Sequence, residues 1–118
     1  MAIPLNVFKT TTAVLKAGPF TGDSDVIYTV PNGITTIVLM SQVANTSEDS
    51  SHTVIMSHFN TTTSIETEVV KNFEIQPNDA AGLITGKLIV EQNNQIRASA
   101  SINNQLKLIL SYLESLNG

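Results

Sequence analysis

The side chains best suited to chemistry are two histidines and two glutamates, and each pair has an even spacing. His52 and His58 would share one face of a strand, as would Glu66 and Glu68. The histidines are too far apart along a strand to bind one metal ion, so we interpret each as a surface or hydrogen-bonded histidine. Paired carboxylates carry out glycoside hydrolysis when an apolar pocket raises the pKa of one of them. No such pocket is evident around Glu66 and Glu68, and we interpret them as solubilising charges.

Other sequence patterns of catalysis and cofactor binding do not occur in this chain. It has no cysteine and no Gly-x-Ser-x-Gly elbow, and its glycines stand singly in turn segments instead of forming a phosphate-binding loop. Glu48 and Asp49, with Asp23 and Asp25, could hold calcium loosely, but their spacing differs from that of an EF-hand. We therefore predict no catalytic residue, no metal site and no cofactor, and we expect that the protein is not an enzyme.

The charge balance argues against nucleic acid as a partner. The chain of 118 residues carries a formal net charge of -4, and its six Lys and Arg residues are scattered instead of forming a basic stripe. Only 14% of the residues are charged, while 42% are hydrophobic, which is enough for one domain with a real core. Met1 to Lys9 does not resemble a secretory leader, and no apolar run is long enough to span a bilayer. We expect a protein made in the cytoplasm that binds neither nucleic acid nor membrane.

Several β-rich segments separated by turns must position these side chains. Strands are predicted over residues 25–30 and 34–44, on either side of the turn Pro31-Asn32-Gly33. The apolar residues at the centre of 34–44 are continuous, which is typical of a strand covered on both faces. A further strand over 52–59 is expected to pair with 64–70 through a short Asn- and Thr-rich turn.

The last third of the chain predicts a β-meander. Its middle run alternates Ile96, Ala98, Ala100 and Ile102 with polar residues, and its last run, 106–113, alternates in the same way. A three-residue loop over 103–105 would pair the apolar residues of the two runs directly, and its asparagines tolerate the left-handed conformation that such a loop needs. The last run could also be written as a helix, but its alternation favours a strand.

These segments add up to seven or eight strands and predict an all-β fold, an antiparallel β-sandwich that is either immunoglobulin-like or a jelly roll. We divide the chain into an extended N-terminal arm with an edge segment, residues 1–22, and a sandwich domain, residues 23–118. The arm could be a frayed end, or it could order on a neighbouring subunit, because it is more apolar than a solvated tail requires. The candidate assembly contacts are Ile3, Leu5, Val7 and Phe8.

A resemblance extends over nearly the whole chain. The segments that carry it are Phe8 to Thr10, Ile27 to Gly33, Thr36 to Leu39, Glu68 to Ile75, Gly86 to Glu91 and Leu108 to Glu114. Together they resemble the small virion structural proteins of tailed bacteriophages, of the T4-like cyanophage type. The turn after Glu91 departs from the related pattern, because it has Gln92-Asn93-Asn94 where that pattern usually has Gly-Asp.

The resemblance implies a structural role in a virion with no catalysis. We expect an accessory or decoration protein of the capsid, or a component of the neck or tail, which forms a homo-oligomer and contacts the major capsid, neck or tail proteins. The alternative is a carbohydrate-binding or adhesin module, because such modules often use β-sandwiches. That alternative needs an aromatic platform for sugars, whereas only 5% of the residues are aromatic and both tyrosines, Tyr28 and Tyr112, lie in predicted core strands.

Overall fold

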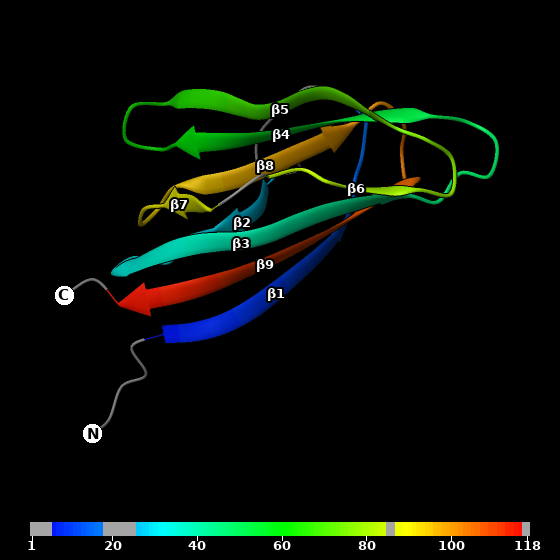
Figure 1. Cartoon of the computed structure of the whole chain (residues 1–118). Helices are drawn as coiled ribbons and strands as arrows, with labels where there is room; N and C mark the ends of the chain where they lie inside the picture. Colours follow the sequence, from blue (N-terminus) through cyan, green and yellow to red (C-terminus); the bar gives the residue numbers. More distant parts are fainter. Residues whose placement is uncertain (1–5, 18–25, 85–86, 117–118) are drawn as a thin grey trace.

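A computed structural model describes residues 6–17, 26–84 and 87–116 of the chain. Within these residues there is no helix, and two antiparallel sheets pack face to face (Figure 1). This arrangement confirms the predicted all-β sandwich. The nine strands of the described residues are β1 (Asn6–Val14), β2 (Val26–Thr29), β3 (Ile34–Asn45), β4 (His52–Asn60), β5 (Ile65–Ile75), β6 (Ala80–Gly82), β7 (Leu88–Val90), β8 (Gln95–Ala100) and β9 (Leu106–Leu116).

The strand order identifies the sandwich as a jelly roll. The first sheet, sheet A, has the order β1-β9-β3-β6, with β7 also paired to β3, and the second, sheet B, has the order β2-β8-β4-β5. If β6 and β7 count as one interrupted strand, the first strand pairs with the last, the second with the next to last, and so on inward to the β4–β5 hairpin. A long antiparallel ribbon rolled up in this way is the jelly-roll arrangement, so the immunoglobulin-like alternative does not apply.

The core lies between the sheets and is built from the alternating side chains that the sequence indicated. In β8, Ile96, Ala98 and Ala100 are buried, and β9 is a strand in which every second residue from Leu106 to Glu114 is buried. Other strands contribute residues that are wholly buried, among them Val38, Val43, Val54, Met56 and Val90.

The predicted meander is wrong, although its buried faces are right. β8 belongs to sheet B and β9 to sheet A, so their apolar residues face each other across the core instead of pairing side by side. The loop between them, residues 101–105, crosses from one sheet to the other. It is fixed by backbone hydrogen bonds from Ser101 N to Thr53 O and from Asn104 N to Leu15 O, and Asn104 has the expected left-handed backbone, with φ of 66°.

Nine residues of the segment predicted as an arm form a strand of the sandwich. β1 pairs with β9 through nine successive residues, from Asn6 opposite Ser115 to Val14 opposite Lys107. Leu15 follows directly and is buried in the core. Ile3 and Leu5, two of the predicted assembly contacts, lie outside the described residues.

Candidate functional site

The outer face of sheet A, which points away from the core, carries an apolar ridge that crosses four strands. The strand registers place Phe8 of β1 opposite Leu113 of β9, Leu113 opposite Ile37 of β3, and Ile37 opposite Ile89 of β7. The residues on either side of Leu113 and of Ile37 are buried, as is Val90 after Ile89, and Phe8 is paired with Leu113, so the four side chains point outward together. Phe8 is 75% exposed and Ile89 is 61% exposed. Each end of the ridge therefore presents a large apolar side chain to solvent.

The rest of this face is almost without charge. Further rows across the strands follow the ridge, and their members alternate with buried residues in the same way. The only charged side chain in these rows, among the residues that the structure describes, is Lys107. The rows consist of Asn6, Ser115 and Thr35; then Thr10, Ser111 and Met40; then Thr12, Ile109, Gln42 and Gly82; then Val14, Lys107, Ala44 and Ala80.

A shallow hollow lies at the other end of the same face. It has a volume of about 550 Å³, and the small side chain of Ala44 forms part of its lining. The outer face thus has a ridge at one end and a recess at the other. The residues around the hollow are Thr12, Ala13, Val14, Gln42, Ala44, Lys107, Leu108 and Ile109.

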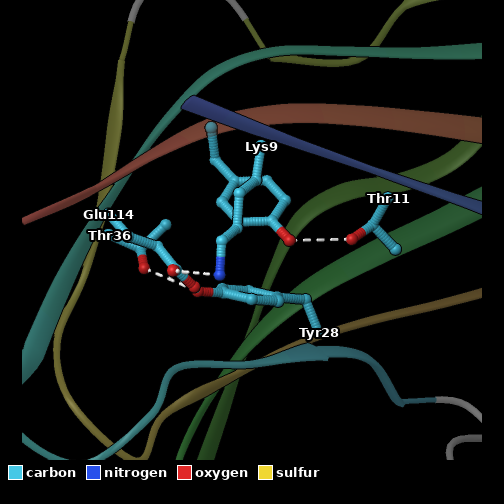
Figure 2. Close-up of polar contacts among 6 residues, drawn as sticks. Lys9, Thr11, Tyr28, Thr36 and Glu114 are labelled. Atoms are coloured by element: carbon cyan, nitrogen blue, oxygen red, sulfur yellow. Dashed lines mark hydrogen bonds and ion pairs between the residues drawn. The ribbon is translucent and has the colours of Figure 1, made fainter. Parts of the chain in front are cut away.

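Behind the ridge, a polar cluster fixes β1 to the sandwich (Figure 2). The Nζ atom of Lys9 lies 2.8 Å from the Oε1 atom of Glu114, whose side chain is only 8% exposed. Tyr28, from sheet B, donates its hydroxyl proton to the other carboxylate oxygen of Glu114. The Thr36 hydroxyl, 2.8 Å away, must then be the donor toward the Tyr28 oxygen. In this way three strands of sheet A and one of sheet B are joined around one carboxylate.

The tyrosine rings complete this cluster. Tyr28 and Tyr112 lie with their ring centroids 4.3 Å apart, and the hydroxyl of Tyr112 is 2.8 Å from the Thr11 hydroxyl of β1. β1 is therefore held by two inward side chains, Lys9 and Thr11, as well as by its backbone. Phe8, which precedes Lys9 in the strand, points the other way and lies on the outer face.

The cluster shifts the pKa values of three ionisable groups, Glu114, Lys9 and Tyr28. Burial disfavours the Glu114 carboxylate, but hydrogen bonds from Lys9 and Tyr28, with the positive charge of Lys9, outweigh it and lower the pKa of Glu114. The hydrogen bond and the charge of Glu114 raise the pKa of Lys9. Burial, followed by the hydrogen bond to Glu114, raises the pKa of the Tyr28 hydroxyl. At neutral pH the cluster thus holds an ion pair and a neutral tyrosine.

The structure separates the acidic and histidine pairs considered from the sequence. Glu66 accepts a 2.6 Å hydrogen bond from Ser57 and lies 3.7 Å from Arg97, whereas Glu68 lies 3.9 Å from Lys71. The two carboxylates are therefore engaged by different partners. His52 and His58 are half-buried in β4, opposite Ile75 and Thr67 of β5.

Among the predicted assembly contacts, Phe8 lies on the outer face and Val7 on the inward side, opposite Glu114. Sequence reasoning missed the other members of the ridge, Leu113, Ile37 and Ile89. A signal for Ile37 was present, because the apolar residues at the centre of 34–44 are continuous. In the single chain the core covers only one face of β3, and the other apolar face stays open.

Within the described part of the chain, no three or more His, Asp or Glu side chains gather as a metal site would require. The same residues contain no helix able to span a membrane. No family model, curated protein or solved structure matches this chain.

Proposed function

We propose that this protein is a non-enzymatic structural component of a virion, an accessory or decoration protein of the capsid or a component of the neck or tail. The observation that carries this proposal is the outer face of sheet A. Its described strand rows consist mainly of apolar, Thr, Ser and Ala side chains with one charged residue, Lys107, and such a surface is suited to permanent contact with other proteins.

Two further points support the proposal. The jelly roll is a recurrent architecture of viral capsid domains, although it also occurs in lectins, so the fold raises the expectation by analogy only. The resemblance of the sequence to small virion proteins of tailed bacteriophages points in the same direction.

The tyrosines weigh against the carbohydrate-binding alternative. Tyr112 is 4% exposed, and the hydroxyl of Tyr28 is engaged by Glu114 and Thr36 inside the cluster. Neither ring is available as a stacking platform for a sugar.

Mass spectrometry of purified particles tests the proposal. In lysates of cells infected with the phage that carries the gene, we expect this chain in the density-banded particles, at a constant ratio to the major shell protein. Its presence only in the soluble fraction would contradict the proposal. Selective binding to one glycan on an array, without incorporation into particles, would favour the adhesin alternative.

A further inference from the structure

The distribution of charge says which kind of partner the outer face of sheet A can accept. The chain has a net charge of -4, yet its described acidic side chains lie in sheet B, in loops or, for Glu114, in the interior. A strongly acidic or basic partner would be matched by opposite charges, whereas the described strand rows of this face contain only Lys107, and the exposed Lys87 and Glu91 beside Ile89 have opposite signs. Two copies of the face, in contrast, can approach without the repulsion that other surfaces of an acidic protein would produce.

The shape of the face favours a second copy over an unrelated apolar protein. The ridge formed by Phe8, Leu113, Ile37 and Ile89 and the hollow around Ala44 lie on the same face, on either side of the row that contains Ser111. A two-fold axis along that row would place the ridge of each copy over the hollow of the other. Such a contact is isologous, because one surface supplies both the protruding and the receiving part.

The face is also large enough. Strands lie about 5 Å apart and rise about 3.4 Å per residue, so nine residues each of β1, β9 and β3, with the three residues each of β6 and β7, cover roughly 560 Å². Two such faces would bury about 1,100 Å² in total, which exceeds the roughly 1,000 Å² expected of a biological interface.

We propose that the outer face of sheet A binds the same face of a second copy of this chain, with the ridge of each copy over the hollow of the other. The inference rests on the assembly role proposed above and gives that role a surface and a partner. The continuous apolar centre of β3 follows from it, since in the dimer β3 is covered on both faces.

Sedimentation equilibrium of the full chain, with matched Ile to Thr variants, tests this inference. Ile89→Thr removes one end of the ridge, and Ile65→Thr makes the same change at a side chain that is 60% exposed in sheet B. Phe8→Thr removes the other end of the ridge. We expect a dimer for the native chain and for Ile65→Thr. For Ile89→Thr and Phe8→Thr we expect a dimer dissociation constant at least about tenfold higher. Circular dichroism checks that each variant is folded.

Three results would overturn the inference: a native chain that stays monomeric at every concentration, a dimer that neither ridge variant weakens, or a dimer that Phe8→Thr weakens and Ile89→Thr does not. The last result would indicate pairing through the free edge of β1, since Ile89 lies near the opposite edge of the sheet. These results are independent of the particle experiment. A monomer found in virions would contradict the dimer and support the proposed function. A dimer absent from virions would support the dimer and contradict the proposed function.

Discussion

At the scale of single residues, Glu114 is the side chain around which the polar cluster is built. It is the one charged residue classed as buried in the described part of the chain, and it is stabilised by a cation from β1 and a hydroxyl from β2. A buried carboxylate without partners would be costly, so the cluster is stable only when these strands are in place together. Glu114 therefore couples the edge strand that carries Phe8 to the interior.

The pKa shifts of the cluster predict how stability depends on pH. The pKa of Glu114 is lower in the folded chain than in the unfolded chain, so its contribution is present above about pH 4.3 and is lost as the pH falls through the lowered value. The pKa values of Lys9 and Tyr28 are raised, so their contribution is present below about pH 10 and is lost at higher pH.

Glu114→Gln is expected to lower the free energy of unfolding by about 1–3 kcal/mol at neutral pH, because it replaces an acceptor of charge-assisted hydrogen bonds. It should also flatten the loss of stability below about pH 4.3. Urea unfolding at a series of pH values measures both effects, with Glu68→Gln, an exposed carboxylate, as the control. If Glu114→Gln loses stability at acid pH as steeply as the native protein does, the ion pair does not contribute to stability as described.

At the scale of elements, the sequence predicted which residues face the core better than it predicted which strands pair. Alternation in 96–102 and 106–113 identified the buried faces, because the side-chain period of two is the same whichever neighbour a strand has. It could not say whether the next strand continues the same sheet or crosses to the other. The β4–β5 pairing was predicted correctly because a short turn leaves little choice.

The cluster around Glu114 could not be predicted because its members are far apart in sequence. Tyr28 and Glu114 are separated by 86 residues, and no local pattern connects them. The same holds for the ridge, whose four residues come from four strands. Only the continuous apolar run at the centre of β3 gave a sign of the ridge, because it predicted apolar side chains on both faces of that strand.

The loop that crosses between β8 and β9 depends on the left-handed backbone of Asn104. Asn104→Ala should lower the free energy of unfolding by about 1–2 kcal/mol, since a side chain that cannot bond locally is strained at positive φ, whereas Asn104→Gly should cost much less. Urea unfolding of the two variants measures the difference. Equal stability would mean that the loop relaxes to another conformation.

β1 is expected to contribute to stability as well as to assembly. Deleting residues 1–12 removes Lys9, Thr11 and most of the pairing of β1 with β9, so it should lower the free energy of unfolding. Lys9→Met in the full chain removes the ion pair but keeps β1, so it should retain part of the stability that the deletion loses. A truncated chain as stable as the native one would mean that β1 only lies against the sheet.

At the scale of the whole molecule, charged and uncharged surfaces are segregated. Sheet B carries the ion pairs of Glu66 with Arg97 and of Glu68 with Lys71, while the described strand rows on the outer face of sheet A contain Lys107 alone. The outer face of sheet A is therefore the less charged of the two broad faces.

This segregation predicts how self-association responds to salt. Contact through an apolar face should not weaken when sodium chloride is raised to about 0.5 M, where attraction between exposed charges is largely screened, and sulfate should strengthen it. Sedimentation at several salt concentrations measures this response. Dissociation of the dimer by sodium chloride would mean that charged groups hold it together.

The pairing of the first strand with the last has a consequence for the newborn polypeptide. While the ribosome is still making the middle of the chain, β1 has already emerged, but its partner β9 follows all the other described strands in the sequence. Until β9 is made, Phe8 and its neighbours have no strand to pair with. Pairing β1 with β9 then closes a loop that contains all the other described strands, and closing so long a loop costs entropy and slows folding. We therefore expect translation speed and chaperones to matter most for β1, which in the finished protein carries one end of the ridge.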